Sequence, residues 1–183
     1  MKLIFRLVAG SVLLGLVGCN ILPAPQTDIV RYFTLSSPGT VQVTPDGTTV
    51  RPVQVAGYLR SREMAVRVAE NEVVYLPEVR WAEPLADAIT QLLRTRLSSA
   101  GGNGVVTVQV QRCELVRFQG NAVHFSATYS ILAPGENAGP KRGGFTASPR
   151  TWDGKDYGAL VGLIRDQVSE LGDAIAVALP EKK

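Results

Sequence analysis

Cys19 is the side chain whose position most directly implies chemistry. It follows a basic start at Lys2 and Arg6, an apolar segment from Leu7 to Val17, and the small residue Gly18. A basic start, a short apolar stretch and a small residue before the cut match a secretory signal, so we expect cleavage directly before Cys19. The apolar segment is much shorter than the roughly 20 residues that a membrane-spanning helix needs.

The tetrapeptide Leu16-Val17-Gly18-Cys19 resembles the lipobox of bacterial lipoprotein signals. The resemblance implies that the Cys19 thiol receives a diacylglycerol and that its new amino group is acylated, for example with palmitate. Each buried CH₂ contributes about 0.8 kcal/mol, so several chains on one residue anchor a protein firmly. Asn20 stands where the enterobacterial inner-membrane retention signal has Asp, which favours the periplasmic face of the outer membrane. The alternatives are an uncleaved anchor, or a secretory peptide with an incidental cysteine.

No other group of residues predicts catalysis. His124 is the only histidine, and no Cys, Asp or Glu lies at a metal-ligand spacing from it, so we interpret it as solvent-facing. The chain has no Gly-x-Ser-x-Gly motif, and no glycine-rich phosphate loop joins a strand to a helix. The acidic pairs Glu70 with Glu72 and Asp153 with Asp156 fit a polar turn and a helix start. We therefore expect no catalytic residue, no cofactor and no metal, and an envelope hydrolase remains an alternative without a visible nucleophile.

Composition favours one small domain. Without its first 18 residues the chain has 165, with 17 basic and 16 acidic side chains, a formal balance of +1. That length is enough to bury roughly 70% of the surface of the unfolded chain in one core, and the balance implies no nucleic-acid partner. Apart from Cys19 the only thiol is Cys113, which we interpret as a small buried residue; a mixed disulfide is the alternative.

The hydrophobic pattern predicts strands, a helix, strands and a second helix. Alternation at period two, with a polar turn at residues 70–72, indicates strands over 32–35, 53–57, 64–68, 73–76, 106–118, 123–131 and 145–148. The alternation loses its phase from Arg112 to Phe118, which predicts a bulge or an edge position there. We expect residues 134–144 to form a glycine-rich hairpin loop. Helical spacing indicates helices over 85–97 and about 157–179, the first opened by Pro84 and the second capped by Asp153.

This order lacks the alternation of a parallel α/β fold. It predicts an α+β fold, a two-layer sandwich of a largely antiparallel sheet with two helices on one face. Gly158 and Gly162 are spaced to allow a close backbone approach, which we expect between helix and sheet; a helix pair between subunits of a homo-oligomer is the alternative.

Basic and aromatic residues in the first half have two interpretations each. Arg60, Arg62, Arg67 and Arg80 could meet anionic headgroups or an acidic partner, although a solvated face with scattered ion pairs is the simpler interpretation. Trp81 could contact a partner, but we favour a large side chain that closes the core where a strand enters a helix.

Three ordered motifs carry a family resemblance. The motifs that follow the lipobox along the chain are Tyr32-Phe33-Thr34-Leu35, Gly57-Tyr58-Leu59 and Arg80-Trp81-Ala82-Glu83-Pro84-Leu85. In this order the chain resembles the ABC-type transport auxiliary lipoproteins, the PqiC-like family. The tract from Arg80 to Leu85 is the most specific element, and from Val105 onward the agreement is one of pattern.

The resemblance implies a division into a signal peptide at 1–18, a lipidated N-terminus and linker at 19–30, and one auxiliary domain at 31–183. It also implies a non-enzymatic lipoprotein that docks with an MCE-domain protein and helps to move lipids between the inner and outer membranes. The alternative function is a general lipoprotein of outer-membrane assembly or envelope integrity. The only site residue that we predict is Cys19, as the point of lipidation.

Overall fold

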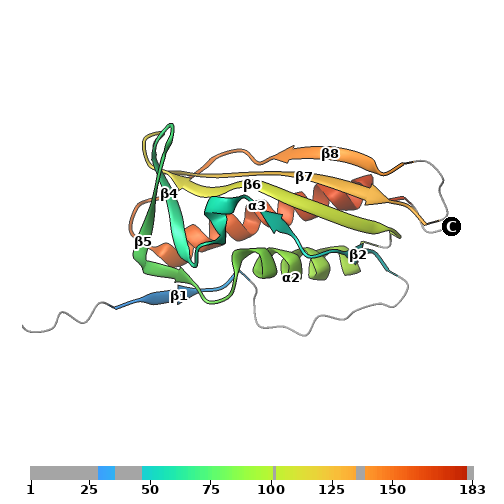
Figure 1. Cartoon of the computed structure of the whole chain (residues 1–183), viewed down its shortest axis with the longest axis horizontal. Coiled ribbons are helices and arrows are strands. Elements are labelled where there is room, and N and C mark those ends of the chain that lie inside the picture. The colour runs from blue at the N-terminus through green and yellow to red at the C-terminus, as the bar shows by residue number, and fades with distance from the viewer. Residues whose placement is uncertain (1–28, 36–46, 101, 135–138, 181–183) are drawn as a thin grey trace, which may run out of the picture.

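The computed structural model describes residues 29–35, 47–100, 102–134 and 139–180. Within these ranges two helices and nine strands form two layers (Figure 1). The strands are β1 (Arg31–Phe33), β2 (Thr49–Val50), β3 (Gln54–Val55), β4 (Glu63–Ala69), β5 (Glu72–Trp81), β6 (Val105–Val116), β7 (Ala122–Leu132), β8 (Lys141–Thr146) and β9 (Arg150–Thr151). The helices are α2 (Leu85–Ser98) and α3 (Tyr157–Ala178), and a 3-10 turn, η1, spans Gly57–Arg60.

The strands make one mixed sheet in the order β1-β5-β4-β6-β7-β8. The long pairings, β4 with β5, β6 with β7 and β7 with β8, are antiparallel, as predicted. The parallel pairings are short: β1 joins β5, while β2, β3 and β4 follow one another along a single edge of β6. The predicted α+β fold is therefore confirmed, with short parallel pairings, one at the β1 edge and three along β6, that the pattern did not indicate.

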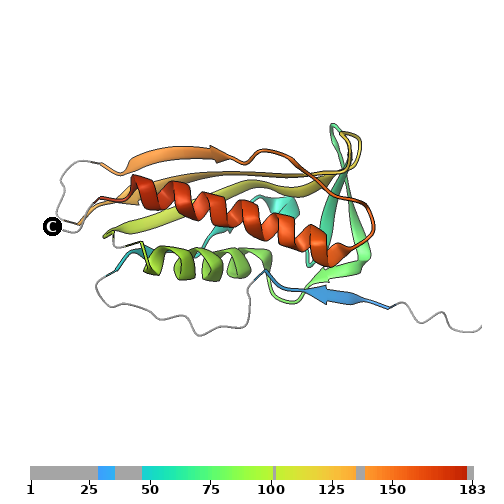
Figure 2. The same ribbon diagram turned by 180° about the vertical axis from the view of Figure 1, so that it is seen from behind.

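Both helices cover the same face of the sheet, as predicted, and they pack against each other (Figure 2). Alternating residues of β6 and β7 point into the interface, because a strand presents every second side chain to the same side. They meet the apolar stripes of the helices in one core, which includes Val106, Val108, Val110, Phe125, Ala127, Ile131, Ile89, Leu93, Leu97, Leu160, Ile164, Val168, Leu171 and Ile175.

The hairpin of β4 and β5 stands away from the plane of β6 and β7 (Figure 1). β4 pairs with β6 through only two residue pairs, Val66 with Leu115 and Arg67 with Val116. The predicted bulge lies nearby, where the register of β6 against β7 shifts between Val110 and Arg112. Since an extra residue bends a strand and increases its twist, the bulge helps to turn this end of the sheet.

Two local predictions near the C-terminus are wrong. β8 begins at Lys141, so residues 141–144, which we expected in a loop, are paired with β7. The cap of α3 is Asp156, whose carboxylate accepts a hydrogen bond from the Gly158 amide at 2.8 Å. Asp153 instead accepts from the Lys155 amide, and Gly154 at φ 81° turns the chain between the two aspartates.

The expected close approach at Gly158 and Gly162 is also wrong. A Cβ atom at Gly162 would have only an Arg165 guanidinium nitrogen near it, at 3.9 Å, and one at Gly158 would meet the capping side chain of its own helix. Gly172 makes the close contact instead, because a Cβ there would lie 2.8 Å from Arg96 Cγ of α2. The tight packing is thus between the two helices of one chain.

Candidate functional site

The predicted lipidation site, Cys19, lies outside the described residues, as do the expected signal peptide and most of the expected linker. The described chain begins at Ile29, ten residues after Cys19. Ten residues span at most about 35 Å when fully extended. Any membrane attachment at Cys19 would therefore hold the start of the domain within that distance of the membrane.

The first described strand is joined directly to the sheet. β1 pairs with β5 from Arg31 opposite Val79 to Phe33 opposite Trp81, and the Ala82 amide donates to the Phe33 carbonyl at 2.8 Å. Leu35, just beyond β1, is fully buried. A pull on the N-terminus would therefore act on the core and not on a loose tail.

The Arg80 to Leu85 tract is a structural junction. Trp81 is only 3% exposed, and its amide donates to the Arg62 carbonyl at 2.7 Å. Pro84 precedes the first residue of α2, and Leu85 is buried. The interpretation of Trp81 as a core residue is confirmed, because its buried indole closes the core where β5 leads into α2.

Glu114 is the charged centre of the bent end of the sheet. Its side chain is fully buried, and it accepts two hydrogen bonds from Arg67, Nε to Oε1 at 2.8 Å and Nη2 to Oε2 at 3.1 Å. Arg112 Nε adds a third at 2.9 Å. Burial alone would raise the pKa of Glu114, but the hydrogen bonds and charges of Arg67 and Arg112 outweigh burial and lower it.

Tyr58 packs beside this ion pair. The Arg67 guanidinium lies 5.8 Å from the Tyr58 ring centroid, and the Tyr58 hydroxyl donates to the Gln111 carbonyl. Burial, followed by the Glu114 charge, raises the pKa of Tyr58 to about 12. The tract of Gly57, Tyr58 and Leu59 thus helps to hold η1 against β6. This role is structural, like that of the Arg80 to Leu85 tract.

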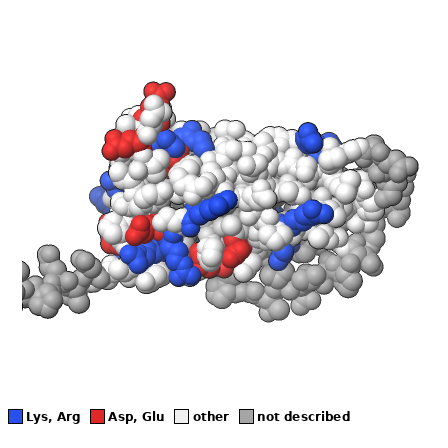
Figure 3. Space-filling model, in the orientation of Figure 1, with Lys and Arg blue, Asp and Glu red and all other residues white. Residues whose placement is uncertain are grey.

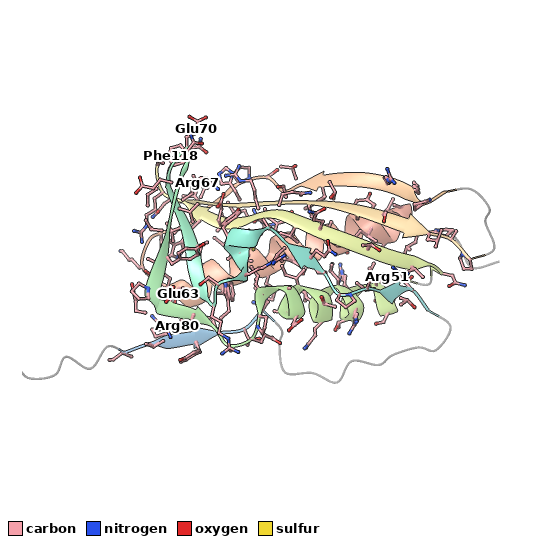
Figure 4. The ribbon with its side chains drawn as sticks, in the orientation of Figure 1. Arg51, Glu63, Arg67, Glu70, Arg80 and Phe118 are labelled. Carbon is pink, nitrogen blue, oxygen red and sulfur yellow. The ribbon has the colours of Figure 1, made fainter. Side chains whose placement is uncertain are left out.

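The four arginines with two interpretations, Arg60, Arg62, Arg67 and Arg80, separate into two kinds. Arg67 belongs to the buried ion pair, and Arg80 pairs with Glu63 at 3.4 Å and donates to the Pro77 carbonyl (Figure 4). Arg60 and Arg62 are exposed. The expected basic balance is therefore divided between structural ion pairs and solvated side chains. Sequence reasoning missed Glu114, whose only signal is that it is the one acidic residue in a largely apolar strand.

Two turns form a projecting end of the molecule, which we call the hairpin end: residues 70–71 between β4 and β5, and 117–121 between β6 and β7. Figures 1 and 2 both place them together. The Arg117 amide donates to the Arg67 carbonyl at 2.9 Å, and Arg67 Nη1 donates to the Glu70 carbonyl at 2.9 Å, so the two turns are joined. Phe118 is 45% exposed on this end (Figure 4).

The face of the sheet away from the helices holds a shallow groove of about 590 Å³. It crosses four strands and is lined by Gln54, Thr107, Gln109, Thr128, Tyr129, Ser130, Arg142, Gly143 and Gly144. Sequence alternation identified the polar positions of β7 as the outward face but not the groove, which depends on how β3 and β8 are aligned with β6 and β7.

Two further reactive side chains, Cys113 and His124, lie on the paired strands β6 and β7 but not directly opposite each other. Cys113 is buried, and burial, followed by the Glu114 charge, raises its pKa to about 12. His124 is half-buried opposite Glu114, and burial and the Arg112 charge lower its pKa. Within the described ranges no group of three His, Cys, Asp or Glu side chains could hold a metal ion. No helix there is long and apolar enough to cross a membrane.

The family comparison places the chain in a class of transport auxiliary proteins. The model of the family of ABC-type transport auxiliary lipoprotein components matches residues 33–176, most of the chain. The chain belongs to this family, and the sequence-based identification is confirmed.

Solved structures share the fold. A crystal structure of an uncharacterized protein is 17% identical over 80% of this chain and 96% of its own, with a TM-score of 0.65. Protein XCC0632 from Xanthomonas campestris, assigned to the family DUF330, is 16% identical over 79% of this chain and 92% of its own, with a TM-score of 0.61. No curated protein matches the chain.

Proposed function

We propose that this chain is a lipid-anchored, non-enzymatic docking component of an intermembrane lipid-transport system, and that its partner is an MCE-domain protein. The observation that carries the proposal is the family match over residues 33–176, which assigns the chain to transport auxiliary lipoproteins. A signal peptide at 1–18, a lipidated linker at 19–30 and a domain at 31–183 complete the proposed organisation. The periplasmic face of the outer membrane is its proposed location.

The geometry of β1 supports an anchoring role. Phe33 is paired within the sheet, its ring lies 6.4 Å from that of Tyr157 on α3, and Leu35 is fully buried. A short tether that continues into a packed strand positions a rigid body near a membrane. Such a body needs a partner surface and no catalytic group.

The hairpin end is the proposed partner surface. Phe118 and Tyr75 are the exposed aromatic side chains near it, 45% and 39% exposed, and the buried ion pair at Glu114 holds the strands beneath them. Rigid aromatic and arginine side chains dominate the energetics of many protein interfaces. We therefore expect Phe118 to contact the partner.

Metabolic labelling with palmitate tests the anchor. The proposal expects label on the wild-type chain and none on Cys19→Ala, with the unlipidated variant released from membranes. Absence of label from both proteins would overturn the lipoprotein part of the proposal.

A matched pair of surface variants tests the partner surface. Phe118→Ser should greatly reduce crosslinking to the MCE-domain protein, whereas Val177→Ser should not. Val177 is 89% exposed and is the second-last residue of α3. That end of α3 lies at the opposite end of the molecule from the hairpin end (Figures 1 and 2). Both residues are exposed and apolar, so equal crosslinking by the two variants would remove the hairpin end as the partner surface.

A further inference from the structure

The groove on the uncovered sheet face is lined mainly by uncharged polar residues and glycine. Its side chains are neutral hydrogen-bonding groups with one exception, the guanidinium of Arg142. Gln54 lies opposite Gln109, Gln109 opposite Thr128, and Thr128 opposite Gly144, so one row of outward positions crosses four strands. A second row runs from Thr107 through Ser130 to Arg142.

The groove is deeper on the β8 side because Gly144 has no side chain there. A Cβ atom at Gly144 would have no heavy atom within 4 Å, and the neighbouring hydroxyl side chains are short. Strands lie about 4.8 Å apart, so the row from Gln54 to Gly144 is about 14 Å long. A volume of about 590 Å³ falls within the range of small-ligand sites.

Arg142 gives the groove a positive charge that no lining carboxylate balances. Among the described residues no carboxylate lies within ion-pair distance of Arg142, and none lines the groove. Figure 3 shows no acidic side chain on the part of this face formed by β8 and the adjoining halves of β6 and β7. On this face the acidic side chains lie at the hairpin end, near β5 and beside the start of α2 (Figure 3).

We propose that this groove binds an anionic polyol of the glycerol phosphodiester class. Arg142 would receive the phosphate, because a guanidinium presents donors in a fork that matches two phosphate oxygens. The amides of Gln54 and Gln109 and the hydroxyls of Thr107, Thr128 and Ser130 would exchange hydrogen bonds with the polyol. The groove is open and its polar groups are hydrated, so we expect modest affinity. This binding does not depend on the proposed docking role.

Titration of the full-length protein in a non-ionic detergent tests the proposal by amide NMR. The probe is glycerophosphoglycerol, with glycerol and inorganic phosphate as the two half-ligands. We expect saturable shifts at residues 107–109, 128–130 and 142–144 with glycerophosphoglycerol, and much weaker shifts with either half-ligand. Phosphatidylglycerol in bicelles distinguishes a lipid headgroup from the free compound, and saturation with either source supports the site.

Matched variants assign the binding to the groove. Arg142→Gln should weaken binding at least about tenfold, as expected for loss of a charged hydrogen bond, whereas Lys155→Gln, which removes an exposed charge elsewhere, should not. Gly144→Val should fill the groove without a clash, while Thr146→Val, one position along the same face of β8, should leave binding unchanged. The proposal would be overturned if neither source gave a saturable shift, or if inorganic phosphate bound as tightly as glycerophosphoglycerol. Binding of wild-type strength by both Arg142→Gln and Gly144→Val would also overturn it.

Discussion

At the scale of single residues, Glu114 is the carboxylate whose burial most needs compensation, because its side chain is fully buried. A fully buried carboxylate is costly unless its oxygens are paired, and here Arg67 and Arg112 provide three hydrogen bonds. A buried ion pair is weak evidence for net stability, because an apolar replacement of both partners can be as stable. Its more specific effect is to fix β4 on β6, where only two residue pairs join the strands.

Replacement of Glu114 by Gln should destabilise the fold by about 3 kcal/mol, because it leaves Arg67 with no carboxylate in a site shielded from water. Arg112→Gln should cost much less, since Arg112 is 39% exposed and Arg67 keeps both of its bonds to Glu114. Urea denaturation monitored by tryptophan fluorescence measures both values. Equal midpoints for wild type and Glu114→Gln would contradict a stabilising role for the pair.

The same carboxylate predicts an acid dependence. The folded-state pKa of Glu114 lies below its ordinary value of 4.5, so its contribution to stability is complete above that value and is lost as the pH falls through the folded pKa. The free energy of unfolding of the wild type should therefore fall below pH 4.5 more steeply than that of Glu114→Gln. Parallel pH profiles for the two proteins would rule this linkage out.

Cys113 should be unreactive in the native protein. Its buried thiol has a pKa raised to about 12, so almost none is thiolate near neutral pH, and it is shielded from reagents. In the Cys19→Ala variant, which leaves Cys113 as the only thiol, iodoacetamide should label the protein in urea and not in buffer. Rapid labelling in buffer would show that the strand opens.

At the scale of elements, two glycines of α3 have opposite environments. Gly162→Ala should stabilise the fold by about 0.5–1 kcal/mol, because Ala is the better helix former and the space is open. Gly172→Val should destabilise it by about 1–3 kcal/mol, since its side chain would press against Arg96 and Leu93 of α2. Thermal unfolding compares the two, and a stabilised Gly172→Val would refute tight packing of α2 on α3.

The local pattern was enough to predict most elements. Alternating Val106, Val108 and Val110 indicated a half-covered strand, and the stripe from Leu160 to Ile175 indicated a helix, because burial on one face leaves a periodic trace. The first four residues of β8 were expected in a loop because Gly143 and Gly144 lack side chains, whereas its end was predicted as part of a strand over 145–148. The two glycines have a low intrinsic preference for a strand, but pairing of β8 with β7 stabilises them there, and the Tyr129 ring covers Gly143.

The candidate sites were less predictable than the elements. Glu114 and Arg67 are 47 positions apart, and nothing in the local pattern sets the register of β4 against β6. The groove needs Gln54, Thr128 and Arg142 on one face, which only the alignment of three separate pairings provides. Sequence periodicity identifies faces, whereas a site depends on which faces become neighbours.

At the scale of the whole molecule, the two ends of the described chain lie far apart. β1, the first described strand, lies at the end of the molecule that carries β5, and α3, the last described element, finishes at the opposite end (Figures 1 and 2). A tether at Cys19 would thus hold one end of an elongated body. The hairpin end and the uncovered sheet face would both stay accessible to other molecules.

Crosslinking in cells that express both this chain and the MCE-domain protein of its transport system is the most direct test of the proposed function. The lipidated wild-type chain should recover the MCE-domain protein, with recovery lowered by Phe118→Ser and kept by Val177→Ser. Repeated failure to recover it with a folded, membrane-bound wild-type chain would contradict the docking role.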